Sequence, residues 1–264
     1  MEKENPTQLF QELVDLVEKL RSEDGCPWDR EQTRNSLKPL MLEELYEALE
    51  AIDREDEVSL KEELGDMLLH IIFHAQIGKE HGTFTIEDVL TGIIEKMKQR
   101  HPHVFGKTQV TGVDQVLLNW ENIKSKEKNR ENRFSSIPRS LPALLRAFAL
   151  QSRVARVGFD WSNAHEVWEK VEEELKELKE AMAEGQLDKV EREWGDLVFT
   201  LVNLARHLGV QPEESLRQTC DRFEERFTLM EKEIESKGQD LSGLSLEEMD
   251  VLWENAKKKK ENPQ

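Results

Sequence analysis

Residues 173–196 read EELKELKEAMAEGQLDKVEREWGD, and residues 43–66 read EELYEALEAIDREDEVSLKEELGD. The two stretches align without a gap at an offset of 130 residues. Each carries the pattern EExxE, followed after fifteen residues by ExxD. Self-similarity at a fixed offset is the mark of a repeated structural unit. We therefore expect the chain to contain one unit twice.

The apolar residues around these acids keep the same offset and recur at helical spacing. In the first helix Leu37, Met41, Leu45, Ala48 and Ile52 correspond to Val167, Val171, Leu175, Leu178 and Met182. In the second helix Leu64, Met67, Leu68, Ile71 and Ala75 correspond to Trp194, Leu197, Val198, Leu201 and Ala205. Steps of three and four residues are typical of one face of an amphipathic helix. The sequence predicts a duplicated helical hairpin, with Val171 and Trp194 at the centres of two apolar stripes.

The remainder of the chain also has helical periodicity. Further helices are predicted over residues 8–20, 86–100, 212–235 and 246–258. Only 13 glycines and 8 prolines interrupt the 264 residues. The expected fold class is therefore all-α, with tandem duplicated helical-bundle units.

A charged, aperiodic segment separates the two copies. Residues 124–133 read KSKEKNRENR, and Pro138 and Pro142 follow shortly after. Such composition predicts a linker. We expect a first domain at residues 1–123, a charged linker at 124–142 and a second domain at 143–264.

The composition excludes several classes of protein. With 55 acidic and 37 basic residues the formal charge is −18, which disfavours a nucleic-acid polymer as partner. No signal-peptide pattern and no run of roughly 18 apolar residues occurs, so no membrane partner is expected. Cys26 and Cys220 lie far apart and predict neither a disulfide nor a zinc site. We expect a cytoplasmic protein.

The repeated acids predict a groove lined by carboxylates in each unit. At about 100° per residue, Glu174 and Glu177 fall on one flank of the first stripe, and Glu193 and Asp196 fall on one flank of the second. In an antiparallel hairpin these four side chains can converge. Oxygen-only ligands favour a hard cation, and Mg²⁺ fits best. The first unit carries a possible second metal site at the matching positions Glu44, Glu47, Glu63 and Asp66.

Two other metal sites are considered. A di-iron carboxylate bundle needs Glu-x-x-His on two helices, and that spacing does not occur. His70 and His74, four residues apart beside Asp66, leave open a different metal site in the first unit, although hydrogen-bonded core histidines are the commoner case.

Several motifs resemble the MazG family of nucleoside triphosphate pyrophosphohydrolases, in its two-domain bacterial form. Besides EExxE and ExxD they are GCPWD at residues 25–29, RHPHVF at 100–105, IPRSLPALLRA at 137–147, VGFDW at 157–161 and NLARHLG at 203–209. The resemblance covers nearly the whole chain. It implies an all-α enzyme, usually dimeric, that uses Mg²⁺ and water to cut nucleoside triphosphates between the α and β phosphates, releasing monophosphate and pyrophosphate.

The resemblance also implies roles for particular residues. Glu174, Glu177, Glu193 and Asp196 would hold the metal, and Glu174 or Glu173 would orient the attacking water. Substrate phosphates would meet the cations Lys170, Lys189, Arg222 and Arg226, and Trp253 would stack on the base. Glu225 stands where the family leads us to expect another basic residue, which departs from the pattern on this helix.

The two units differ in their cations. At the offset of 130, Lys170 and Lys189 are replaced by Leu40 and Ser59, and Asn203 is replaced by Phe73. We therefore expect the second domain to be catalytic and the first to be structural or regulatory, although Lys96 and Arg100 could serve the first groove. The competing hypothesis is a non-catalytic helical regulator that binds nucleotides or a partner protein in the same groove.

Overall fold

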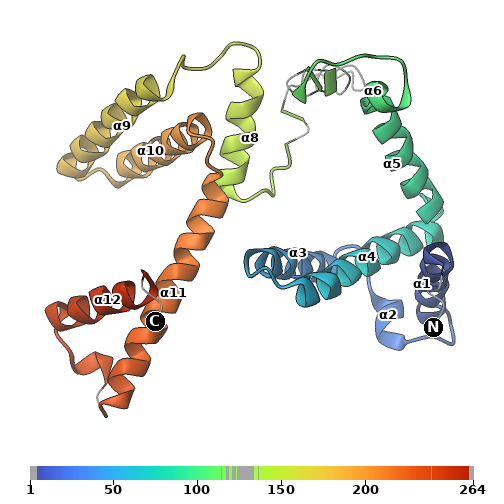
Figure 1. Ribbon diagram of the computed structural model, residues 1–264, viewed down its shortest axis with the longest axis horizontal. Helices are drawn as coiled ribbons and strands as arrows, with labels where there is room; N and C mark the ends of the chain where they lie inside the picture. Colours follow the sequence, from blue (N-terminus) through green and yellow to red (C-terminus); the bar gives the residue numbers. More distant parts are fainter. Residues whose placement is uncertain are drawn as a thin grey trace. The chain divides into compact units, whose positions relative to one another are not determined.

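The computed structural model describes residues 5–113, 115–116, 119–120, 123, 134–135, 137–238 and 240–261, and over these residues it contains helices and no strand. The chain divides into two units, Met1–Asn129 and Arg130–Gln264. The first unit contains α1 (Pro6–Leu20), α2 (Pro27–Glu31), α3 (Leu37–Asp53), α4 (Glu57–Glu80), α5 (Ile86–Arg100) and α6 (Pro102–Phe105) (Figure 1). The second contains α8 (Ala143–Ala155), α9 (Ala164–Glu184), α10 (Leu187–His207), α11 (Pro212–Ser236), η1 (Leu241–Gly243) and α12 (Leu246–Glu261). The predicted all-α class is confirmed.

The predicted helices are present with small shifts at their ends, and the described residues also contain helices that were not predicted. The helix expected at residues 8–20 begins at Pro6, and the one expected at 246–258 continues to Glu261. The short α2 and α6 and the longer α8 have no counterpart in the sequence prediction. The charged segment at 124–133 lies outside the described residues. None of the described helices is long and apolar enough to cross a membrane.

The first unit is built on the antiparallel hairpin of α3 and α4. The start of α4 is fixed by Asp56, whose Oδ1 accepts hydrogen bonds from the backbone N–H groups of Val58 and Ser59. The hydrophobic core of this unit forms where α1 packs on α4. It consists of Val17, Leu37, Ile72, Phe73 and Ile77.

Arg21 joins this hairpin to the segment that carries the GCPWD motif. Its guanidinium is only 5% exposed and forms a paired contact with the Glu80 carboxylate, at 2.8 Å from Nε and 2.7 Å from Nη2. Nη1 also donates to the backbone carbonyls of Asp29 and Gln32, at 2.6 Å and 3.1 Å. One buried cation therefore holds the middle and the C-terminal end of α2 against the end of α4.

The second unit repeats the hairpin with α9 and α10. Gly185 ends α9 in the left-handed conformation, at φ 70°, which a residue with a side chain adopts at a cost. The hairpin core is made of Val167, Val171, Leu178, Leu197 and Leu204. Helix α8 packs on α10, where the buried Gln151 Nε2 donates to the Phe199 carbonyl at 2.7 Å. A separate core joins α11 to α12 through Met230, Ile234, Leu252 and Ala256.

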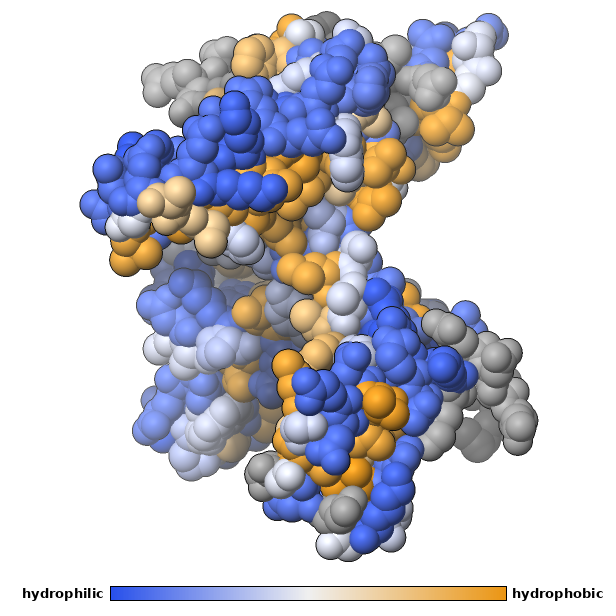
Figure 2. All heavy atoms as spheres, turned by 90° about the vertical axis from the view of Figure 1, so that its left-hand side faces the viewer, coloured by the Kyte–Doolittle hydropathy of each residue, from blue (hydrophilic) through white to orange (hydrophobic). Residues whose placement is uncertain are grey.

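Each hairpin leaves part of its predicted apolar stripe exposed. Trp194, the centre of the predicted apolar stripe of α10, is 60% exposed in the single chain. Its counterpart Leu64 is 54% exposed. The reason is geometric: a two-helix layer covers one side of each stripe, and Leu197 and Leu204 occupy the covered side of α10. Figure 2 shows the resulting apolar surface between rows of charged side chains in its upper part, where α9 and α10 lie.

Candidate active site

Three acids of the second unit form one cluster at the hairpin. Glu174 and Glu177 come from α9 and Glu193 comes from α10, and each offers one carboxylate oxygen such that all three oxygens lie within 4.8 Å of one another. The EExxE spacing places Glu174 and Glu177 one turn apart on α9, and the antiparallel return of α10 brings Glu193 opposite them. Glu174 is only 6% exposed. A buried acid beside two others needs a compensating cation.

Lys170 supplies part of that compensation from one turn earlier on α9. Its Nζ lies 2.8 Å from Glu174 Oε1 and 2.9 Å from Glu173 Oε1. These hydrogen bonds, to Glu174 and then to Glu173, raise the pKa of Lys170 well above its ordinary value. The side chain predicted to meet substrate phosphate is therefore engaged with the acids of the site and remains charged. The Lys170 contact also links Glu173, which lies outside the three-acid cluster, to Glu174.

Asp196 and Lys189 are placed differently from the other predicted residues of the hairpin. Asp196 lies one turn after Glu193 on α10 and is exposed, outside the group of three. Lys189 lies near the start of α10, where its Nζ is 3.1 Å from Glu184 Oε1 at the end of α9. In this arrangement Lys189 neutralises the turn of the hairpin and is not paired with the clustered acids.

A second polar network involves the VGFDW and NLARHLG motifs, whose role in the structure was not predicted from the sequence. Arg206 donates to the Asp160 carboxylate and, at 2.6 Å and 3.0 Å, to Oδ1 of the buried Asn203. His207 Nε2 lies 3.1 Å from Asp160 Oδ1. Burial opposes ionisation of Asp160, but the hydrogen bonds from Arg206 and His207 outweigh it, so the pKa of this carboxyl is lowered. The network ties the segment before α9 to the end of α10 and so supports the hairpin.

The predicted phosphate and base contacts of α11 and α12 lie in another part of the unit. Arg226 stacks on the Trp253 ring at 5.8 Å, and Phe223 lies 5.1 Å from the same ring. Arg222 Nη2 donates to Thr219 Oγ1 at 2.7 Å. Helix α12 packs on the C-terminal part of α11, at the end of that helix away from α9 and α10 (Figure 1). The single chain therefore does not bring Arg222, Arg226 and Trp253 to the acids.

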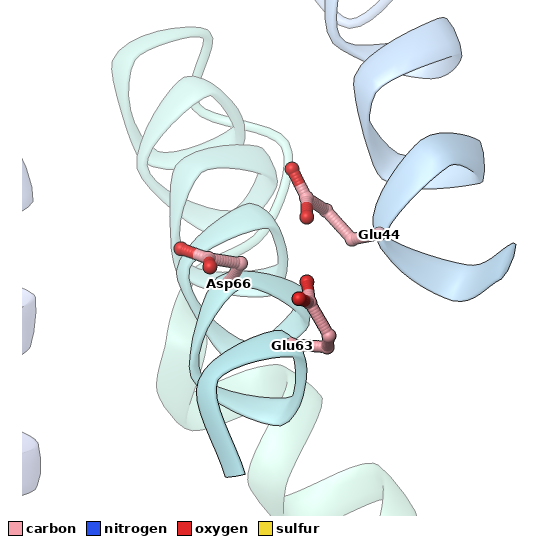
Figure 3. A group of neighbouring side chains, drawn as sticks. All are labelled: Glu44, Glu63 and Asp66. Carbon is pink, nitrogen blue, oxygen red and sulfur yellow. The ribbon is translucent and has the colours of Figure 1, made fainter. Parts of the chain in front are cut away.

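The first unit has a matching cluster with a different membership. Glu44 on α3 and Glu63 and Asp66 on α4 each place one carboxylate oxygen within 4.8 Å of the others. Figure 3 shows the carboxyl groups of Glu44 and Glu63 facing each other between the two helices. Glu47 lies outside this group. Each cluster therefore contains three of the four repeated acids, and the acid that is left out differs between the two units.

In the first cluster, the pKa of Glu63 is shifted by its surroundings. Burial of its carboxyl, followed by the charges of Glu47 and Glu44, raises the pKa of Glu63. An acid with a raised pKa holds its proton more tightly in the folded protein than in the unfolded chain. Its contribution to stability is therefore lost as pH rises through the range just above the ordinary glutamate pKa.

We expect this loss to be visible in the metal-free protein. With a chelator present, the Tm of the wild type should fall as pH rises through the range just above the ordinary glutamate pKa. The Tm of a Glu63→Gln variant should fall less steeply, because glutamine has no proton to release. Thermal unfolding at a series of pH values makes the comparison, with the exposed Glu62→Gln on the same helix as control. Equal slopes for Glu63→Gln and wild type would contradict the assignment.

The donor set of the second cluster fits a hard divalent cation. Its ligands are carboxylate oxygens only, held on two packed helices, and none of the three is a histidine or cysteine. Carboxylates combined with water and substrate phosphate are the usual surroundings of Mg²⁺. The repulsion among three clustered acids is also what a bound dication would relieve.

Comparisons with known proteins match both units. A family model described as the MazG nucleotide pyrophosphohydrolase domain matches residues 32–105, and one described as phosphoribosyl-ATP pyrophosphohydrolase matches residues 143–223. The two matched segments contain the two carboxylate clusters.

Full-length relatives resemble the chain from end to end. The nucleoside triphosphate pyrophosphohydrolase/pyrophosphatase MazG of Thermotoga maritima is 50% identical over 251 residues, which are 94% of this chain and 96% of the relative. The nucleoside triphosphate pyrophosphohydrolase of Escherichia coli K12 is 42% identical over 252 residues, or 93% and 96% of the two chains. The crystal structure of a mazG-related protein from Thermotoga maritima aligns with 44% of this chain and 98% of its own, at 25% identity and a TM-score of 0.38.

Proposed function

Because the chain belongs to the MazG family of nucleotide pyrophosphohydrolases, we propose that its second unit hydrolyses nucleoside triphosphates between the α and β phosphates. The products are nucleoside monophosphate and pyrophosphate. The observation that carries the proposal is the cluster of Glu174, Glu177 and Glu193, in which Glu174 is buried. Mg²⁺ is the proposed cofactor, and the proposed compartment is the cytoplasm, where such triphosphates occur.

The residues of the α9–α10 hairpin are assigned different roles in phosphoryl transfer. Glu174, Glu177 and Glu193 hold the cation, and Asp196 joins them after a change of its side-chain rotamer. The bound Mg²⁺ supplies neutralisation of phosphate charge and a lowered pKa for a coordinated water. Lys170 holds the Glu173 carboxylate beside the cluster, and we assign Glu173 to accept the proton of the attacking water.

The cations position the triphosphate. Lys170 lies beside the acids and meets the phosphate nearest to them, while Lys189 exchanges Glu184 for a phosphate oxygen when substrate binds. Arg222, Arg226 and Trp253 are proposed to reach the substrate from α11 and α12 of a second copy of the chain. That proposal accounts for their distance from the acids within one chain.

A homodimer is further supported by the exposed apolar face, defined as the residues that the hairpins expose at matching positions. It consists of Leu45, Ile52, Leu64 and Ile71 in the first unit and Leu175, Met182, Trp194 and Leu201 in the second. Exposed apolar residues that recur at the same offset in both units indicate a common use for this face. A second copy offers the same face, and pairing of two hairpins makes a four-helix layer that buries both.

The dimer gives a direct prediction. Leu64→Lys combined with Trp194→Lys places a charge in the face of each unit and should convert a dimer to a monomer at micromolar concentration, as measured by light scattering. The control is Trp168→Lys on α9, because Trp168 is exposed but its counterpart at the offset of 130 is Lys38 and it lies outside the repeated face. A wild-type monomer, or a double variant that stays dimeric, contradicts the assignment of this face.

Product analysis tests the proposed activity. The purified protein is incubated with Mg²⁺ and a panel of nucleoside triphosphates, and the products are separated by ion-exchange chromatography. We expect monophosphate and pyrophosphate in equal amounts, because the sequence has no Walker-type glycine loop that would grip the β and γ phosphates for cleavage there. Nucleoside diphosphate and orthophosphate as first products contradict the reaction. Tight binding without turnover of any triphosphate would favour the non-catalytic regulator.

A further inference from the structure

His70 has no counterpart in the second unit and lies at the edge of the first acidic cluster. It follows Asp66 by four residues and Glu63 by seven on α4, so the three side chains share one face of the helix. The residue at the matching position of the second unit is Thr200. The two clusters are therefore alike in their acids and different in this one donor.

The His70 imidazole is buried beside the acidic cluster of the first unit. The residue is 8% exposed, and Nδ1 has no hydrogen-bond partner among the described residues. Nε2 points into the cluster, where Glu44 Oε1 lies 3.8 Å away. That distance is longer than a hydrogen bond. A buried imidazole left in this state costs free energy, because it has given up its hydrogen bonds to water.

The same distance suits two ligands of one metal ion. Donor atoms that each lie about 2.1 Å from an ion can be separated by up to about 4.2 Å. The Nε2 atom of His70 and the Oε1 atom of Glu44 meet that condition. The oxygens of Glu44, Glu63 and Asp66 already gather within 4.8 Å of one another, so small side-chain rotations complete a set of three oxygens and one nitrogen.

We propose that the first unit binds a first-row transition-metal dication through His70 Nε2 and the carboxylates of Glu44, Glu63 and Asp66, in preference to Mg²⁺. An imidazole ligand favours Zn²⁺, Co²⁺ and their neighbours, whereas Mg²⁺ favours oxygen ligands and retained waters. The ion joins Glu44 on α3 to three ligands on α4. It therefore fixes the hairpin of the first unit and is separate from the Mg²⁺ chemistry proposed for the second.

Cobalt binding tests the proposal without relying on turnover. Co²⁺ is titrated into the full-length protein, and binding is followed by calorimetry and by the visible absorption of the ion, which changes when nitrogen replaces oxygen as a ligand. The wild type should bind one Co²⁺ with a nitrogen ligand in addition to ions held by oxygen alone. His70→Leu should weaken that binding at least about tenfold, and Mg²⁺ binding should change much less.

Two further variants, a second ligand substitution and a control, complete the test. Glu44→Gln removes the ligand from the other helix and preserves side-chain volume at a partly exposed position, so the variant should fold and should weaken the same Co²⁺ site. His74→Leu, one turn beyond His70, is the matched control and should bind Co²⁺ as the wild type does. The proposal is overturned when wild-type protein shows no nitrogen-ligated Co²⁺, or when folded His70→Leu or Glu44→Gln keeps wild-type affinity. None of these results depends on whether the second unit hydrolyses triphosphates.

Discussion

Replacing Glu193 by Gln should lower the turnover of a nucleoside triphosphate by roughly 10²-fold or more. The substitution preserves side-chain volume and removes one of three clustered charges, so the protein should remain folded. Its effect on kcat follows because Glu193 is the one clustered acid from α10, and without it α10 could hold the cation only through Asp196, which lies outside the cluster. Steady-state kinetics with saturating Mg²⁺ measures the loss, and Glu177→Gln should behave in the same way.

The repeat provides the matched control. Glu63 occupies the position of Glu193 in the first unit and is likewise part of a three-acid cluster. The first unit, however, has Leu40 and Ser59 where the second has Lys170 and Lys189. Glu63→Gln and Glu47→Gln should therefore change turnover far less than Glu193→Gln. A folded Glu63→Gln protein that is inactive would show that the first unit takes part in catalysis and that the inferred asymmetry is wrong.

Arg21→Met should destabilise the first unit by about 3 kcal/mol. The substitution removes a guanidinium that is 5% exposed, together with its contacts to Glu80 and to the carbonyls of Asp29 and Gln32. Glu80 is one-third exposed and can regain water, which places the loss at the lower end of the range for a broken buried ion pair. Hydrogen exchange of the α1 and α4 amides, measured against denaturant, reports the change for this unit alone.

The neighbouring ion pair is a suitable comparison. Lys79 Nζ lies 2.8 Å from Glu18 Oε1, but both side chains are about half exposed, so Lys79→Met should cost less than about 1 kcal/mol. The hydrogen bond from Arg21 lowers the pKa of Glu80, and the stabilisation by the buried pair is therefore lost as pH falls through that lowered pKa. Equal losses for Arg21→Met and Lys79→Met would contradict the role given to the buried guanidinium.

The repeated hairpin and its acids could be predicted because both depend on local periodicity. An offset of 130 residues and steps of three and four determine which residues share a helix face, and the clusters contain Glu174, Glu177 and Glu193 in one unit and Glu44, Glu63 and Asp66 in the other. The positions of the individual carboxyl groups within each cluster could not be predicted from the sequence. Which three of four acids meet depends on side-chain rotamers, and Asp196 in one unit and Glu47 in the other fall outside the groups.

The features that the sequence did not reveal depend on long-range contacts or on a partner. Lys170 was expected to face phosphate, and its ion pairs with Glu173 and Glu174 follow from the same helix face but were not anticipated. The exposure of Trp194 could not be inferred because an apolar stripe looks the same whether it is covered by its own chain or by another. The placement of Arg226 on Trp253 likewise depends on how α12 returns along α11.

We propose that water, activated beside the acids of the second unit, attacks the α phosphorus of a nucleoside triphosphate. Hydrolysis in water labelled with heavy oxygen, followed by mass spectrometry of both products, tests it most directly. We expect one labelled oxygen in the nucleoside monophosphate and none in the pyrophosphate, with the rate strongly reduced in Glu193→Gln. Label in the pyrophosphate, or labelled orthophosphate beside a nucleoside diphosphate, would contradict it.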